Sequence, residues 1–163
     1  MIFGLTPLGL FHTAISLVAV AAGAIALIRD GKITWDNFLG KAYVVTTVVV
    51  CLTGFGIFQH GGFGKPHALG VLTLAVLAVI FAASRKHFGR YSPYLERVGY
   101  SMTFFFHIVP GITETATRLP VDGPLASSPD DPAIQKAVGI CFILFLIGAL
   151  LQLRKLRTKL MLK

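Results

Sequence analysis

Residues 100–112, YSMTFFFHIVPGI, form an apolar run that contains one ionisable side chain, His107. Pro110 lies inside the run, and Glu114 and Arg118 follow it. An ionisable residue within a membrane span is costly to bury and is therefore a candidate functional residue by default. The stretch predicts a membrane helix that carries a functional site, but it does not by itself indicate the chemistry of that site.

The composition extends this interpretation to the whole chain. Of the 163 residues, 55% are hydrophobic and 13% are charged, and the mean hydropathy is +0.75. A soluble domain contains about 25% charged residues. The formal net charge of +8 does not indicate nucleic-acid binding, because the basic residues lie in short segments between apolar runs, where topology signals are expected. We therefore predict an integral membrane protein whose main partner is the lipid bilayer.

Five segments are apolar enough to cross a membrane, which takes about 20 residues per helix. They are Thr6–Ile28, Ala42–Gln59, His67–Ser84, Arg97–Thr117 and Ala133–Leu153. The glycine-rich segment 61–66 joins the second and third as a tight turn, which favours an antiparallel hairpin. The sequence thus predicts an all-α fold: a single domain, residues 1–163, that forms a bundle of five transmembrane helices.

The charges predict how this bundle is oriented. One end would hold 12 of the 15 basic residues and three acids, and the other would hold Lys65, Arg118, Lys136 and four acids. The twelve are Arg29, Lys32, Lys41, Arg85, Lys86, Arg90, Arg97, Arg154, Lys155, Arg157, Lys159 and Lys163. The positive-inside rule places that end in the cytoplasm. We expect the N-terminus outside, the C-terminus inside, and a multi-pass protein of the bacterial plasma membrane.

With this topology, four of the five histidines fall in the outer half of the membrane on four different helices. They are His12, His60, His67 and His107. At 1.5 Å per residue, His12 lies about 9 Å below the outer end of its helix. Pro110 predicts a kink beside His107, because proline removes a helical hydrogen bond. Glu114 and Arg118 share a helix face with His107 and are spaced to form an ion pair.

Three chemistries suit this layer. The first is haem b, with His12 and His107 as the axial pair and several phenylalanines lining the slot. The second is a divalent metal, zinc or copper, with ligands among His12, His60, His67, His107 and Glu114. The third is a quinone or proton site, at which a histidine and a carboxylate exchange protons. The phenylalanines are Phe11, Phe55, Phe58, Phe104, Phe105 and Phe106.

Structural roles compete with these chemistries. His60 and His67 can simply flank a turn at the membrane interface, and His12 can form a hydrogen bond to a neighbouring helix. No CxxCH, HExxH or GxSxG motif is present. The leading hypothesis is therefore a histidine site that binds haem b or a metal in an electron-transfer role. The alternatives are a cofactor-free accessory subunit of a larger membrane complex and a small proton-coupled transporter, which would need to oligomerise. No enzymatic activity is assigned.

One segment resembles a known family. Residues 39–45, LGKAYVV, lead into a span that contains threonine and glycine, and Tyr100-Ser101-Met102-Thr103 opens a later span. This layout resembles a bacterial family of small predicted multi-span membrane proteins of unknown function, which often carry His-Arg where this chain has Asp36 and Asn37. The resemblance covers the second to fourth spans. It implies a multi-span architecture and no particular chemistry.

Overall fold

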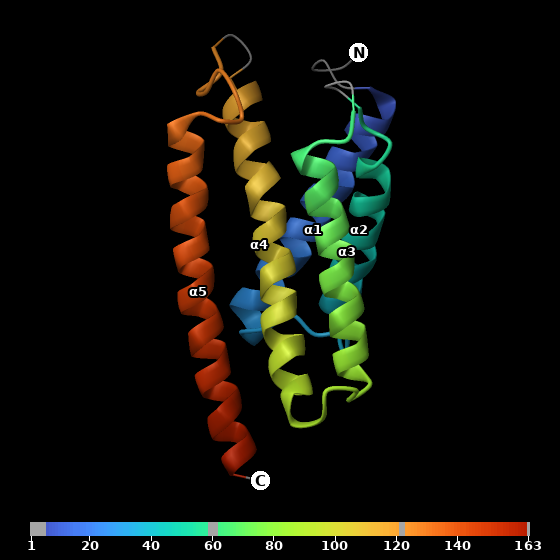
Figure 1. Ribbon diagram of the computed structural model, residues 1–163, viewed down its shortest axis with the longest axis vertical. Helices are drawn as coiled ribbons and strands as arrows, with labels where there is room; N and C mark the ends of the chain where they lie inside the picture. Colours follow the sequence, from blue (N-terminus) through green and yellow to red (C-terminus); the bar gives the residue numbers. More distant parts are fainter. Residues whose placement is uncertain (1–5, 59–61, 121–122, 163) are drawn as a thin grey trace.

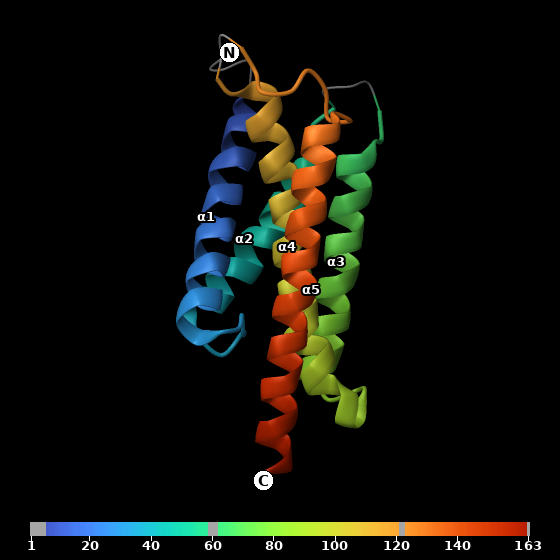
Figure 2. The same ribbon diagram turned by 90° about the vertical axis from the view of Figure 1, so that its left-hand side faces the viewer.

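The computed structural model describes residues 6–58, 62–120 and 123–162. Every regular element in these ranges is helical. The elements are α1 (Pro7–Asp30), α2 (Phe38–Gly54), α3 (Lys65–Ser84), the 3-10 turn η1 (Gly89–Tyr91), α4 (Ser92–Arg118) and α5 (Pro132–Met161). The α-helices lie side by side along the long axis, and each runs antiparallel to the one before it (Figures 1 and 2). The prediction of an all-α bundle is confirmed.

Three of these helices, α1, α3 and α5, are long and apolar enough to cross a membrane, and α2 is a shorter apolar helix. In α5, only 11% of the most apolar window is buried inside the protein. Large apolar side chains such as Leu144 and Leu151 are therefore exposed along this helix. Such a surface is stable against lipid, since acyl chains are as apolar as leucine. These features support a membrane protein.

The helix starts follow from local capping. The side chains of Thr6, Asn37 and Asp131 accept hydrogen bonds from the backbone N–H groups of Gly9, Gly40 and Ala133. An N-cap side chain satisfies an N–H group that has no partner within the helix. All the α-helices except α2 also have a proline at one of their first two positions, where a missing N–H costs nothing.

The second helix does not have the bounds that the sequence predicted. The sequence predicted Ala42–Gln59, whereas α2 begins at Phe38 and ends at Gly54. The cap at Asn37 starts the helix earlier, and a turn at residues 55–56 ends it. The helix α4 also begins before its predicted span, and α5 continues through the basic tail. Hydropathy locates the apolar part of a helix, whereas backbone hydrogen bonds set its ends.

The core lies where α1, α2, α3 and α4 meet. Its buried members are Ala22, Ala26, Ile33, Tyr43, Ile80 and Tyr100. Glycines allow close approach: a Cβ atom on Gly23 would lie 2.6 Å from Phe104, and one on Gly99 would lie 2.6 Å from Ile80. The helix α5 packs on α4, where Phe105 contacts the rings of Phe142 and Phe145. The first four helices therefore form the body of the molecule, and α5 lies along its side.

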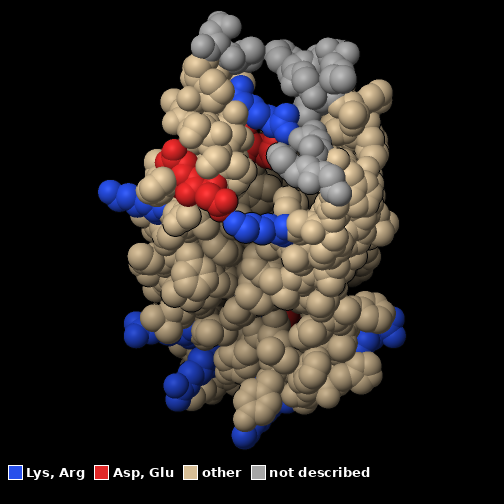
Figure 3. All heavy atoms as spheres, turned by 45° about the horizontal axis from the view of Figure 1, so that its top comes forward, with Lys and Arg blue, Asp and Glu red and all other residues tan. Residues whose placement is uncertain are grey.

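Near one end of α5, hydrogen bonds connect this helix to α4 and to the end of α1. The amide of Gln152 accepts a hydrogen bond from Ser101 and donates one to the carbonyl of Gly31, at 2.8 and 3.0 Å. Near the other end, Lys65 forms an exposed ion pair with Asp130, which lies just before α5. Figure 3 shows acidic side chains together with some lysines and arginines towards one end of the molecule, whereas the charged side chains visible at the opposite end are mostly lysines and arginines.

Candidate functional site

The most buried polar side chains of the described residues form hydrogen bonds between α2 and α4. Thr47 Oγ1 lies 2.9 Å from His107 Nε2, and Tyr43 Oη lies 2.9 Å from Thr103 Oγ1. Tyr43, Thr47 and Thr103 are fully buried, and His107 is 8% exposed. We call these four residues the α2–α4 polar network. A buried polar group without a partner is costly, so each member stabilises the position of another.

The register of the two helices produces this network. Tyr43 and Thr47 are one helical turn apart on α2, as Thr103 and His107 are on α4. Because α2 and α4 run in the same direction (Figure 1), both hydrogen bonds join residues 60 positions apart. The Tyr43 hydroxyl also interacts electrostatically with Thr47, and the Tyr43 ring meets the edge of the His107 ring at 5.9 Å between centroids. The four side chains are thus connected.

His12 on α1 lies beside this network. Its Nδ1 atom is 2.9 Å from Thr53 Oγ1 on α2, and the side chain is half-buried. Gly54 leaves room for the ring, since a Cβ atom there would lie 3.3 Å from His12 Cε1. The two imidazoles of His12 and His107 lie within electrostatic range of each other. α2 therefore supplies a threonine partner to each ring.

Glu114 and Arg118 form the ion pair expected from their spacing, one turn apart on α4. The Glu114 side chain is 58% exposed, and the carboxylate lies within electrostatic range of His12. Glu114 therefore combines an exposed carboxylate with an electrostatic interaction that reaches His12. Pro110 lies within the continuous helix α4, so the predicted kink stays a prediction.

His67 has a different environment. Its Nδ1 atom accepts a hydrogen bond from the backbone N–H of Gly64, at the start of α3, and its ring lies against Phe58 and Phe63, at 5.0 and 5.2 Å between centroids. The ring is buried, and within the described part of the chain its Nε2 atom has no hydrogen-bond partner. These contacts match the alternative in which His67 stabilises the turn. His60 lies outside the described residues.

The predicted metal site does not assemble in residues 6–58, 62–120 and 123–162. No group of three or more histidine, cysteine, aspartate or glutamate side chains there is close enough to hold a metal ion. Protein zinc sites use three or four such ligands. Of the predicted ligands that the structure describes, His12 interacts electrostatically with both Glu114 and His107. His67 lies apart from them, against Phe58 and Phe63.

The pair His12 and His107 suits a haem by residue type, but its surroundings do not form a haem slot. His107 Nε2, the atom that would ligate iron, is bonded to Thr47 in the buried network. The phenylalanines proposed to line the slot have separate partners: Phe104 contacts Tyr43, Phe105 contacts α5, and Phe58 stacks on His67. The described residues therefore fit two histidines that are each hydrogen-bonded to a threonine of α2 better than they fit a haem pocket.

Sequence reasoning missed the threonines and the tyrosine of this site. Tyr43, Thr47, Thr53 and Thr103 lie in apolar stretches of α2 and α4, and threonine in such stretches commonly bonds to its own backbone. A usable signal was present in the spacing, because Tyr43–Thr47 and Thr103–His107 both place two polar residues one turn apart on a single face. Only contact between those faces shows that they belong together.

No protein-family model, curated protein or solved structure matches this chain. The resemblance noted for residues 39–45 and 100–103 stays a prediction.

Proposed function

We propose that this chain is a five-span membrane protein that transfers protons through its histidine pair. Its N-terminus would lie outside and its C-terminus in the cytoplasm. The alternation of helix directions supports the topology, and the end that carries most lysines and arginines supports the orientation. With this orientation, His12, His107 and Glu114 belong to the outer half of the membrane.

The observation that carries the function is the α2–α4 polar network with His12 beside it. Histidine exchanges protons near neutral pH more readily than other side chains. Hydroxyl groups of threonine and tyrosine can both donate and accept hydrogen bonds, so a proton can pass between them without a charge being left in the membrane core. Ionisable residues in membrane spans commonly form such relays.

The order of the groups gives the route. The Glu114 carboxylate is exposed and in electrostatic range of His12, which is in range of His107. From His107, a hydrogen bond leads to Thr47, which interacts electrostatically with Tyr43, and Tyr43 is hydrogen-bonded to Thr103. One turn before Thr103, Tyr100 lies within electrostatic range of carboxylates at the other end of the bundle. We infer a path that starts at Glu114 and is directed towards the cytoplasm.

Proton flux into proteoliposomes tests this proposal. The vesicles would contain a pH-sensitive dye, and a potassium gradient with valinomycin would drive proton entry. We expect the wild-type protein to acidify the lumen faster than empty vesicles do. Loss of an acid–base group costs about a hundredfold in rate where proton transfer limits it, so His107→Gln and His12→Gln should abolish most of the flux.

His87→Gln is the matched control, because His87 is exposed in the connection between α3 and α4. It should leave the flux unchanged. The proposal is rejected if wild-type vesicles acidify no faster than empty ones, or if His107→Gln conducts as well as the wild type.

Haem b held by His12 and His107 is the second candidate. It is favoured by one observation, the approach of two histidines from α1 and α4 in an apolar bundle. Binding would require His107 to leave Thr47. Absorption spectra of the purified protein, oxidised and reduced, test it: a Soret band lost in His107→Ala and kept in His87→Ala would support haem. A colourless protein that gains no Soret band when haem is added would exclude this candidate.

A further inference from the structure

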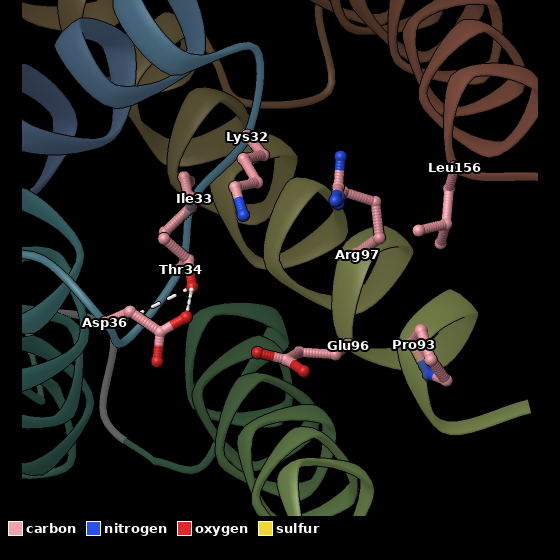
Figure 4. Close-up of a pocket in the computed structure, with 8 residues that line it drawn as sticks. All are labelled: Lys32, Ile33, Thr34, Asp36, Pro93, Glu96, Arg97 and Leu156. Carbon is pink, nitrogen blue, oxygen red and sulfur yellow. Dashed lines mark hydrogen bonds between the residues drawn. The ribbon is translucent and has the colours of Figure 1, made fainter. Parts of the chain in front are cut away.

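A charged cavity of about 110 Å³ lies at the end of the molecule opposite to His12. It forms where the connection between α1 and α2 meets the first turns of α4 and a late turn of α5 (Figure 4). The lining residues are Lys32, Ile33, Thr34, Asp36, Pro93, Glu96, Arg97 and Leu156. No residue of the α2–α4 polar network belongs to this lining, so the cavity is a separate site.

The cavity is lined by two acids and two bases. Figure 4 shows the carboxylates of Asp36 and Glu96 facing each other, with the ammonium group of Lys32 and the guanidinium group of Arg97 across the space. Within the described chain, none of these four forms an ion pair with another. Charges of both signs therefore surround the space without neutralising one another in direct contact.

Two further observations describe the carboxylates of this cavity. The Thr34 hydroxyl donates a hydrogen bond of 2.9 Å to Asp36 Oδ2 and holds that carboxylate in place. Burial raises the pKa of Glu96, and the charge of Asp36 raises it further, whereas Lys32 and Arg97 oppose the shift. A cation placed between the two carboxylates would relieve this repulsion.

Apolar side chains from the α1–α2 connection and from α5 complete the lining of the cavity. Ile33 is 2% exposed and Leu156 is 8% exposed. The predicted membrane spans end at Ile28 and begin again at Arg97, so the cavity lies where apolar helix gives way to charged segments. Pockets between membrane helices that present charged side chains at the interface can bind lipid headgroups.

We propose that this cavity binds a phosphoethanolamine group. Its phosphate would accept charge-assisted hydrogen bonds from Lys32 and Arg97, and its ammonium group would donate to Asp36 and Glu96. A ligand with only one charge would leave two of the four side chains uncompensated. The expected source is phosphatidylethanolamine of the surrounding bilayer, and a soluble phosphoethanolamine is the other source of the same chemistry. The proposal does not depend on proton transfer.

Lipid binding to the purified full-length protein in detergent tests the proposal. Native mass spectrometry would compare phosphatidylethanolamine, phosphatidylcholine and phosphatidylglycerol with the same acyl chains, and O-phosphoethanolamine would be added as a competitor. Phosphatidylcholine cannot donate N–H hydrogen bonds, and phosphatidylglycerol has no ammonium group. Since a hydrogen bond to a charged group contributes about tenfold in affinity, we expect phosphatidylethanolamine to bind at least about tenfold more tightly than either.

Variants assign this preference to the cavity. Glu96→Gln and Asp36→Asn should remove the preference for phosphatidylethanolamine over phosphatidylcholine, whereas Arg97→Gln should weaken the binding of both. Arg157→Gln, an exposed arginine one residue after Leu156, should change neither. Binding of phosphatidylcholine to the Glu96 and Asp36 variants at the wild-type level shows that these proteins are folded.

The outcomes separate the sources and the alternatives. Stronger binding of O-phosphoethanolamine than of the lipid would support the site and assign it to a soluble ligand. Equal binding of phosphatidylethanolamine and phosphatidylcholine by the wild type would overturn the proposal. Equal binding of phosphatidylglycerol would overturn it in favour of a simple anion site, and a preference that survives in both Glu96→Gln and Asp36→Asn would place the selectivity elsewhere.

Discussion

At the scale of single residues, Thr47 has the strongest influence on the candidate site. Its side chain is fully buried between α2 and α4, and its hydroxyl is bonded to His107 Nε2. A histidine in an apolar bundle needs such a partner, because an unsatisfied polar group there is costly. Thr47 therefore stabilises the fold and also fixes the position of the His107 imidazole between α2 and α4.

Thr47→Val tests this role, since valine keeps the shape of threonine and removes the hydroxyl. We expect the free energy of unfolding to fall by about 1–2 kcal/mol, because His107 Nε2 loses its partner. Titration of the purified protein with a denaturing detergent measures the change.

Thr46→Val is the control for this change. Among the residues that the structure describes, the Thr46 hydroxyl bonds only to carbonyls of its own helix, those of Ala42 and Tyr43, so its loss should have little effect. In a His107→Phe background, Thr47→Val should cost less than in the wild type. Equal costs in the two backgrounds would show that the Thr47–His107 hydrogen bond does not stabilise the fold.

Glu96 predicts a dependence of stability on pH. Its pKa is raised above the ordinary 4.5, mainly by burial, so the folded state holds this proton more tightly than the unfolded state does. The stabilisation is complete below pH 4.5 and is lost as the pH rises through the raised pKa. In detergent free of phosphatidylethanolamine, Glu96→Gln should therefore gain thermal stability relative to the wild type as the pH is raised to 7.

Asp30→Asn provides a control with the opposite sign. The hydrogen bond from Arg29 lowers the pKa of Asp30, so its stabilisation is present above the ordinary pKa and is lost as the pH falls. This variant should be less stable than the wild type at neutral pH and equal to it in acid. If the difference between Glu96→Gln and the wild type were constant with pH, the inferred shift at Glu96 would be wrong.

At the scale of helices, the turn between α1 and α2 brings the backbone of Gly40 into close contact with the backbone of Thr34. A Cβ atom on Gly40 would lie 1.7 Å from the carbonyl oxygen of Thr34. Gly31 ends α1 with a φ of 65°, a conformation that favours glycine. These two glycines allow α2 to start directly beside the end of α1, and this placement aligns α2 with α4.

Gly40→Ala should therefore destabilise the protein, although alanine normally favours a helix by about 1 kcal/mol over glycine. The clash is with a backbone atom, so α2 must move and the α2–α4 register must change. We expect a lower yield of folded protein in size-exclusion chromatography and a lower melting temperature.

Gly148→Ala is the matched control, because a Cβ atom on Gly148 meets nothing within 4 Å. It should leave both measures unchanged. A Gly40→Ala protein as stable as Gly148→Ala would contradict the packing at this turn.

At the scale of the whole molecule, the orientation in the membrane can be measured with fusions. A fluorescent protein at the C-terminus should be bright, because it folds in the cytoplasm, whereas alkaline phosphatase joined there should be inactive. Alkaline phosphatase inserted after Pro124, in the connection between α4 and α5, should be active. The reverse pattern would invert the orientation, and active reporters on the same side would change the number of spans.

The sequence alone predicted an all-helical protein and the approximate position of each α-helix that the structure describes. Apolar runs long enough to cross a membrane, prolines and capping residues act locally, and each can be recognised without knowing its neighbours in space. The spacing of Glu114 and Arg118 was sufficient to predict their ion pair, because both residues lie on one helix.

Only the tertiary structure decided which side chains meet. The sequence grouped His12, His60, His67 and His107 by depth, but depth does not fix how each helix is rotated about its axis. Helix packing places His12 and His107 against α2, where His107 is hydrogen-bonded to Thr47, 60 residues away. The same packing stacks the His67 ring on Phe58. Helix rotation depends on the fit of small and large side chains between neighbours, and hydropathy carries no information about that fit.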